Sequence, residues 1–223
     1  MAKLVWDAVG EHRFESGVDH GVLYVAKDTV ESNATSRYQN GVVWNGLTGV
    51  TNSPEGAEPT DLWADNIKYA TLRSAETFGA TIEAYTYPDE FMQCDGSAAL
   101  ATGVYIGQQS RKSFGFCYRT KIGTDTDVDN DNHYLLHIIY NCTASPSERS
   151  YETVNDSPDA ITFSWEISST PVEVTDHKPT SEITIDSTKI DSAKLTTITN
   201  KLYGTENSAP ELPDPDDLFA LIQ

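Results

Sequence analysis

The chain has 223 residues and a formal net charge of −19 at pH 7, with 34 acidic residues against 15 lysines and arginines. This length is enough to bury a sizeable core, and we expect one domain over residues 1–223. The acidic excess argues against a surface that grips a nucleic-acid backbone, because phosphate contacts need clustered lysine and arginine side chains.

No membrane segment or secretion signal is evident in the sequence. There is no run of about 18 apolar residues, which a spanning helix would need. Asp7 and Glu11 interrupt the N-terminal region where a signal peptide would continue its apolar stretch. We therefore expect the chain to be made and kept in a cytoplasm. Its cysteines, Cys94, Cys117 and Cys142, are too few and too scattered for a disulfide framework and predict buried free thiols.

The first 40 residues hold little regular pattern. Residues 1–20 carry two aromatic side chains among polar ones and predict an irregular N-terminal arm. Residues 21–26 form a short apolar run that predicts a strand, and residues 27–40 are polar and predict a loop.

Residues 41–73 predict a long protruding hairpin. Its arms are expected at 41–51 and 61–73, with the turn at 52–60, because that stretch holds two prolines, a glycine and acids. Simple alternation places Trp63, Ile67 and Tyr69 beside Asp65 on one face, and apolar and charged groups together on the other. A hairpin with apolar side chains on both faces suits an arm that binds another subunit.

The middle of the chain is rich in strand patterns. Residues 77–85 and 161–168 alternate cleanly between apolar and polar side chains, and period two also returns from residue 102. Residues 133–140 are apolar on both faces and predict a central strand. Pro88 begins a short helix or turn. Together these segments predict a mainly β protein with a β-sandwich or barrel.

The C-terminal region changes pattern. Asp191 is a suitable N-cap for a helix over 191–203, and Gly204 ends that helix. The rest, residues 205–223, is a proline-rich C-terminal tail with one apolar tip. We expect this tail to matter less to the core than to assembly, since only a few apolar side chains at its end could dock.

Two patterns invite a metal site. Aspartates alternate through residues 125–131, but an EF-hand needs glycine at its sixth position and glutamate at its twelfth, and both possible registers fail. A solvated hairpin loop is the simpler prediction, and a weak cation site of another design stays open. His133 and His137 are four residues apart in strand-like surroundings without an evident third ligand. We expect no metal and no cofactor, and no catalytic constellation stands out, so we expect no enzyme.

Several long blocks resemble the major tail tube proteins of long, non-contractile tailed bacteriophages of Gram-positive hosts. The blocks are WNGLTGVTNSPEGAEPTDLWADNIKYATLRSAETFGATIEAYTYPDEFMQCDG (44–96), QQSRKSFGFCYRTKIG (108–123), HYLLHIIYN (133–141), SWEISSTPVEV (164–174) and KLYGTENSAPELPDPDDL (201–218). The resemblance covers the chain from about residue 10 to the end. Trp63 departs from it, since the family often has tyrosine there.

The resemblance implies a β-sandwich that closes as a hexameric ring into a continuous β-barrel, with one or two flanking helices. Rings would stack on a tape-measure protein, between a tail terminator and distal tail proteins, and the tube would conduct DNA through its lumen without specific binding. The expected location is the virion, after assembly in the host cytoplasm and without a membrane. A negatively charged lumen would repel DNA phosphates.

By position, the resemblance assigns the hairpin at 41–73 to contact with the adjacent ring. The candidate contact residues are Trp44, Asn45, Pro54, Glu55, Glu58, Trp63, Asp65, Ile67 and Tyr69. The candidate lumen-facing acids, on the polar faces of good strands, are Glu83 and Glu166.

Two other functional classes stay open. A carbohydrate-binding β-sandwich on a phage or cell surface would use Trp44, Trp63 and Tyr69 as a stacking platform. A hydrolase would need an aspartate or glutamate with a raised pKa in a concave site. Whether the particle is a phage or derived from a prophage is also open.

Overall fold

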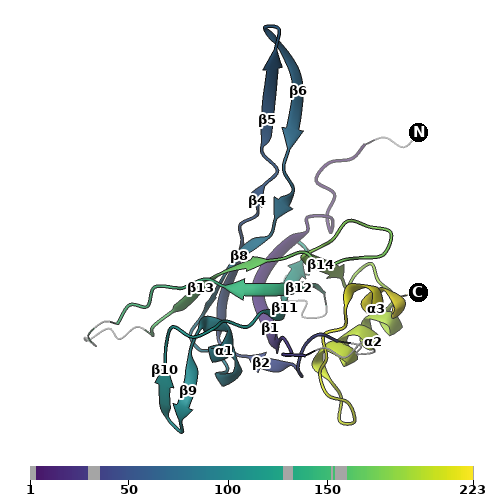
Figure 1. Ribbon diagram of the computed structural model, residues 1–223. Coiled ribbons are helices and arrows are strands. Elements are labelled where there is room, and N and C mark those ends of the chain that lie inside the picture. The colour runs from purple at the N-terminus through teal and green to yellow at the C-terminus, as the bar shows by residue number, and fades with distance from the viewer. Residues whose placement is uncertain (1–3, 30–35, 128–132, 152, 154–159, 223) are drawn as a thin grey trace.

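One large antiparallel sheet organises the computed structural model, which describes residues 4–29, 36–127, 133–151, 153 and 160–222 (Figure 1). The expectation of a mainly β, sandwich-like fold with a few short helices is confirmed. Within the described residues the sheet has eight strands: β1 (Phe14–Val25), β2 (Val42–Trp44), β3 (Leu47–Asn52), β8 (Gly79–Ala84), β11 (Phe114–Gly123), β12 (Tyr134–Ala144), β13 (Phe163–Ser169) and β14 (Glu182–Asp186).

The remaining elements project from this sheet or cover it. Six short strands form three two-stranded ribbons. These pair β4 (Glu55–Gly56) with β7 (Glu76–Thr77), β5 (Pro59–Ala64) with β6 (Ile67–Arg73), and β9 (Ala98–Ala101) with β10 (Val104–Ile106). The helices are a 3-10 turn (Asp89–Phe91), α1 (Met92–Asp95), α2 (Ser192–Tyr203) and α3 (Pro215–Ala220).

The sheet curls back on itself. Its strand order is β2-β1-β11-β12-β13-β8-β3, and β14 pairs with β12 beside β13. The two ends of this path, β2 and β3, are separated in sequence by only Asn45 and Gly46, so β3 returns to the side of β1. A Cβ atom at Gly21 would lie 2.5 Å from a Leu47 methyl group and 3.0 Å from the Trp44 carbonyl oxygen. This close approach requires glycine in β1.

An aromatic core fills the inside of the curled sheet. Trp44 packs against Phe91 with ring centroids 4.5 Å apart, and against Phe116 and Trp165 at 5.5 Å. All four rings are buried. Burial of such large side chains dominates the stability of a core, so these residues hold the two sides of the sheet together.

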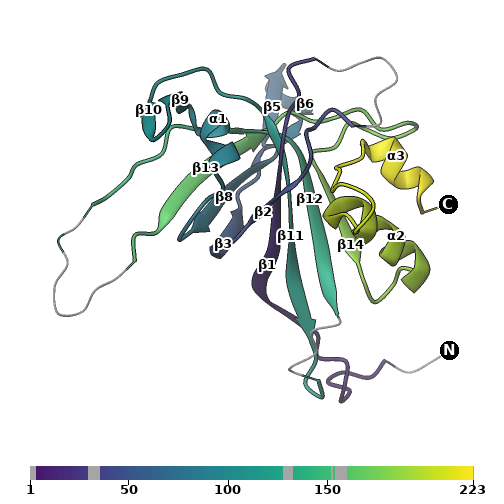
Figure 2. The same ribbon diagram turned by 90° about the horizontal axis from the view of Figure 1, so that it is seen from below.

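A second core lies on the opposite face of β1, β11, β12 and β14, under the C-terminal helices (Figure 2). Ile198 and Leu202 of α2 and Leu218 of α3 are buried there beside Leu136 and Ile138. The sheet is thus sandwiched between its own returning strands and a helical layer, which explains why residues 133–140 are apolar on both faces.

The structure confirms the predicted C-terminal helix and corrects the predicted N-terminal arm. Asp191 accepts hydrogen bonds from the backbone N–H groups of Ala193 and Lys194, and α2 ends at Tyr203 before Gly204. The predicted arm at 1–20 is too long, because β1 begins at Phe14. Register shifts near Gly17 and His20 interrupt the alternation of β1 and hide the strand from periodicity.

The C-terminal tail is more deeply integrated than expected. Leu212 is fully buried, and its carbonyl oxygen accepts a 2.6 Å hydrogen bond from the Ser36 hydroxyl. Lys201 forms an ion pair with Glu211 at 2.6 Å, which ties the tail to α2. The tail therefore belongs to the second core, and the expectation that only its tip could dock is wrong.

Candidate interaction surface

The most prominent surface feature is the ribbon of β5 and β6, which extends well beyond the sheet (Figure 1). Its tip is the two-residue turn Asp65-Asn66, with φ angles of 52° and 64°. Positive φ at both central residues is the requirement of a type I′ turn, which matches the twist of two paired strands. Asp and Asn are among the residues that tolerate this conformation.

This geometry contradicts the predicted turn at 52–60. Pro59 starts β5, and Glu55 and Gly56 pair with Thr77 and Glu76 in a lower rung of the same projection. Proline is tolerated at the first residue of a strand and in strands at the edge of a sheet, and Pro59 meets both conditions. The protrusion therefore runs between β3 and β8, from about residue 53 to 78, with Pro54 at its base and Asp65 at its tip.

The register of the hairpin gives it two different faces. Ala64 pairs with Ile67 and Trp63 with Lys68, but Leu62 pairs with Ala70, so β6 carries a bulge after Lys68. Side chains of paired residues share a face. Trp63 and Ile67 therefore lie on opposite faces, and the predicted grouping of Trp63 with Ile67 is wrong.

One face is a continuous apolar stripe. Pairing and alternation place these residues on it: Leu62, Ala64, Ile67, Ala70 and Leu72. All are exposed except Ala70, which is half-buried. Apolar stripes of this kind mark surfaces that bind another molecule, and we refer to these five residues as the hairpin stripe.

The other face of the hairpin is polar and internally bonded. Asp61 receives a 2.7 Å ion pair from Lys68 and a 2.8 Å hydrogen bond from the Thr71 hydroxyl. These two contacts lower the pKa of Asp61 below its ordinary value. Trp63, at 68% exposure, lies on this face opposite Lys68. Contacts within the hairpin, rather than contacts with the large sheet, thus stabilise its conformation.

The other candidate contact residues divide into two groups. Pro54, Glu55, Glu58, Asp65 and Tyr69 are exposed along the protrusion, as expected for contact residues. Trp44 does not belong with them, because it is 2% exposed and its indole N–H donates a 2.9 Å hydrogen bond to the Thr86 carbonyl. Asn45 is exposed in the short link between β2 and β3, away from the hairpin. The three-residue stacking platform is therefore also excluded.

The candidate lumen acids lie together on one face of the sheet. Glu83 in β8 pairs with Ser164, and Glu166 in β13 pairs with Thr81, so the two carboxylates are diagonal neighbours. Both are exposed, whereas Ile82 and Trp165 between them point into the aromatic core. The structure therefore brings these two acids together on one exposed face of β8 and β13.

The structure contains a second hairpin that the sequence patterns did not predict. β9 and β10 pair as an antiparallel ribbon around Gly103, whose φ is +76°. Leu100 is 70% exposed, and Tyr105 in β10 is also exposed. Period two predicted β10 but not its partner, because Ala98–Ala101 is too short and uniform to alternate. The absence of any charged residue from 96 to 110 is the sequence feature that could have indicated this hairpin.

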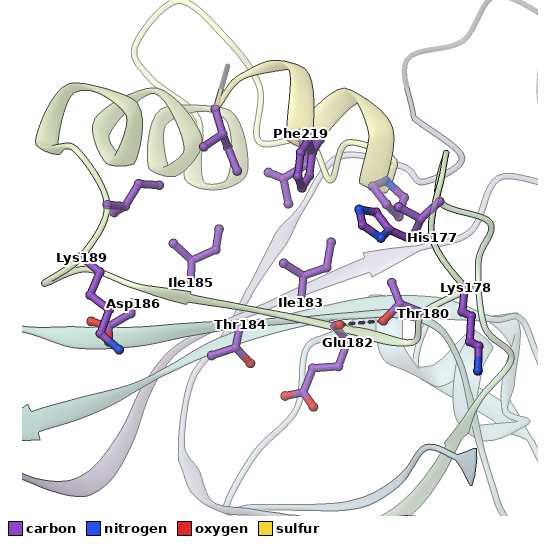
Figure 3. A pocket seen from close by; sticks show the side chains of 15 residues that line it. His177, Lys178, Thr180, Glu182, Ile183, Thr184, Ile185, Asp186, Lys189 and Phe219 are labelled. Atoms are coloured by element: carbon purple, nitrogen blue, oxygen red, sulfur yellow. Dashed lines mark hydrogen bonds and ion pairs between the residues drawn. The ribbon is translucent and has the colours of Figure 1, made fainter. Parts of the chain in front are cut away.

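An open apolar groove of about 520 Å³ lies between β14 and α3 (Figure 3). Ile183 and Ile185 point from β14 toward the helix, and Phe219 faces them from α3. Glu182 and Thr184 point to the other side of the strand (Figure 3). Most of the surface that lines the groove is apolar, which favours an apolar side chain over a charged substrate as its occupant.

The two sequence patterns that could suggest a metal site, the aspartates at 125–131 and the pair His133 and His137, make other contacts where the structure describes them. The Asp125 carboxylate accepts hydrogen bonds from the Gly10 N–H at 2.9 and 3.1 Å, which lower its pKa and hold the N-terminal segment. Asp129 and Asp131 lie outside the described residues. His137 stacks on Tyr118 and contacts Glu182 at 3.2 Å and Thr120 at 3.1 Å. Among the described residues, no group of three potential ligands could hold a metal ion.

The cysteines are buried as free thiols, as predicted. Burial raises the pKa of Cys94 and Cys117 to about 12, and it raises the pKa of Cys142 as well. These thiols are therefore protonated and shielded from solvent at neutral pH, whereas a nucleophilic cysteine reacts as the thiolate.

Comparison with known proteins does not assign a family. Neither the protein-family models nor the curated proteins give a match to this chain. In the part of the chain that the structure describes, no helix has both the length and the apolar character needed to cross a membrane.

Proposed function

We propose that this protein is the structural subunit of a bacteriophage-type tail tube. Six copies would form a ring, and rings would stack into a tube that conducts DNA into a host. The observation that carries the proposal is the hairpin stripe, which projects from the fold and has no partner among the residues of its own chain that the structure describes. An apolar surface held away from the core in this way is explained if a second copy covers it.

Three further features support the proposal. The long resemblance blocks span the protruding hairpin and its neighbouring strands. Within the described residues β2, β3 and β14 each pair with one strand, and closure of a barrel would cover such edges with strands of other subunits. The net charge of −19 suits a channel that DNA passes without being bound.

The proposal implies partners and a location. A tape-measure protein would set tube length, and a tail terminator and distal tail proteins would close the two ends. The protein would belong to the virion after assembly in the host cytoplasm. No catalytic step is required, because assembly and DNA passage depend on subunit contacts and on the charge of the channel.

Electron microscopy and sedimentation of the purified protein over a range of concentrations test this proposal. We expect rings or tubes with a stain-filled axial channel for the wild type. A shortened variant, in which Asn-Gly replaces residues 59–73, should stay folded but lose stacking. The removed residues are exposed apart from half-buried Ala70, so the free energy of unfolding should change by less than about 1 kcal/mol.

Either of two results contradicts the proposal. A wild-type protein that remains monomeric over the whole concentration range has no tube-forming activity of its own. A shortened variant that forms normal tubes would show that the hairpin makes no necessary contact between rings. Circular dichroism of the shortened variant serves as the control for folding.

A further inference from the structure

The β9–β10 hairpin is a second protrusion with exposed apolar side chains, and it lies at the opposite end of the molecule from β5–β6. Figure 1 shows one hairpin at the top of the fold and the other at the bottom. In Figure 2, seen from below, β9–β10 is near the viewer and β5–β6 lies behind the sheet. The large exposed side chains of β9–β10 are Leu100, Val104, Tyr105 and Ile106.

Each protrusion carries an uncharged apolar surface, although the chain is strongly acidic. Residues 96–110 contain no charged side chain, and neither does the hairpin stripe. Copies of a protein with a net charge of −19 repel one another over most of their surfaces. Two uncharged apolar surfaces are the places where copies approach without that repulsion and with removal of apolar area from water.

The surroundings of the two surfaces are complementary. The protrusion from residue 53 to 78 holds five acidic and two basic residues, a net charge of −3. The base of the other hairpin holds Arg111, Lys112 and Arg149, of which Lys112 pairs with Asp28 and Arg149 with Asp95, so these five groups carry a net charge of +1. A protrusion with a net negative charge therefore meets a weakly positive base, which favours this pairing over contact between two acidic protrusions.

We propose that the β9–β10 hairpin is the docking site for the hairpin stripe of a second copy. This inference rests on the proposed function, since it names the partner of the stripe in the neighbouring ring. The two surfaces are different, so the contact is head-to-tail. A head-to-tail contact between opposite ends leaves one free surface at each end and repeats along an axis.

Disulfide trapping between two tagged copies tests the contact directly. One copy carries Ile67→Cys in the stripe, and the other carries Leu100→Cys, Val104→Cys or Ile106→Cys in separate experiments. The natural cysteines are buried and should not compete. We expect a mixed disulfide with at least one of these positions under mild oxidation, because a disulfide needs Cα atoms within about 7 Å.

Lys68→Cys is the matched control, because Lys68 neighbours Ile67 but lies on the opposite face of the hairpin. It should give at least tenfold less mixed disulfide than Ile67→Cys. Mixed disulfides that form equally from both positions contradict a face-specific contact. Trapping of Ile67→Cys only with itself, or with Phe219→Cys at the β14 groove, also overturns the proposal.

A mixing experiment separates this inference from the proposed function. Rings of Ile67→Glu keep β9–β10 intact, and rings of Leu100→Glu/Val104→Glu keep the stripe intact. Neither should stack alone, and the mixture should give pairs of rings without longer tubes. Stacking by either variant alone overturns the docking site. Absence of tubes from the wild type contradicts the proposed function, whereas a specific Ile67–β9–β10 disulfide would still support the contact.

Discussion

Two tryptophans separated by 19 positions have opposite roles. Trp44 ends β2 and Trp63 lies near the end of β5, and both were expected among the contact residues of the hairpin. Trp44 is enclosed by Phe91, Phe116 and Trp165, whereas Trp63 stands on a free hairpin. The difference arises from the curl of the sheet, which places β2 over the inner core, and no local pattern encodes that curl.

Substitution of Trp44 should therefore affect folding rather than binding. Trp44→Ala leaves a large cavity and removes the hydrogen-bond donor to the Thr86 carbonyl, so we expect a loss of about 3–5 kcal/mol in the free energy of unfolding. Trp63→Ala should change it by less than about 0.5 kcal/mol. Urea denaturation of both variants measures this. Equal effects at the two positions would contradict the assignment of Trp44 to the core.

Local rules succeeded where the cause of the structure is local. The Asp191 side chain caps α2 by accepting hydrogen bonds from nearby backbone N–H groups, and Gly204 follows the last helical residue. Both signals act within one turn of helix. The face of Ile67 was mispredicted because simple alternation was continued through the two-residue turn Asp65-Asn66, whereas pairing across that turn places Ile67 opposite Ala64.

At the scale of elements, two proline-rich stretches led to wrong predictions. Pro54 and Pro59 suggested a turn, but Pro59 is the first residue of β5, a position at which proline is tolerated. The tail at 205–223 suggested a loose end, but Leu212 and Leu218 complete the second core. In each case the tertiary partner, which sequence periodicity does not reveal, decides the conformation.

The C-terminal tail should therefore contribute strongly to monomer stability. Leu212→Ala removes a fully buried side chain beside the β-sheet, and we expect a loss of about 2–4 kcal/mol in the free energy of unfolding. Phe219→Ala is the control in the same segment, because Phe219 is 50% exposed and should cost less than about 1 kcal/mol. Chemical denaturation of the two variants decides the matter. A negligible effect of Leu212→Ala would return the tail to a purely assembly-related role.

At the scale of the whole molecule, the sequence indicated the fold class and the existence of a protruding arm. Strand alternation and the central apolar run sufficed for that, because each reports burial of one or both faces of a strand. The opposite placement of the two hairpins was out of reach. The long hairpin leaves the curled sheet between β3 and β8, and the β9–β10 hairpin follows α1. Both positions are set by contacts between residues far apart in sequence.

The arrangement of acids at this scale gives a test of the channel. Glu83 and Glu166 share one exposed face of β8 and β13, away from the helical layer. If that face lines the tube, reversal of both charges should turn a repelling wall into an attracting one. Tubes of Glu83→Lys/Glu166→Lys should retain short duplex DNA at low salt and release it as salt rises, since phosphate contacts weaken steeply with ionic strength.

Nuclease protection distinguishes DNA inside the tube from DNA on its outer wall. Retained DNA should resist digestion in Glu83→Lys/Glu166→Lys tubes. The control reverses two exposed acids elsewhere, in Glu173→Lys/Glu206→Lys, which changes the net charge by the same amount. DNA bound by the control should be digested. Equal protection in both variants, or none in either, would mean that β8 and β13 do not face the channel.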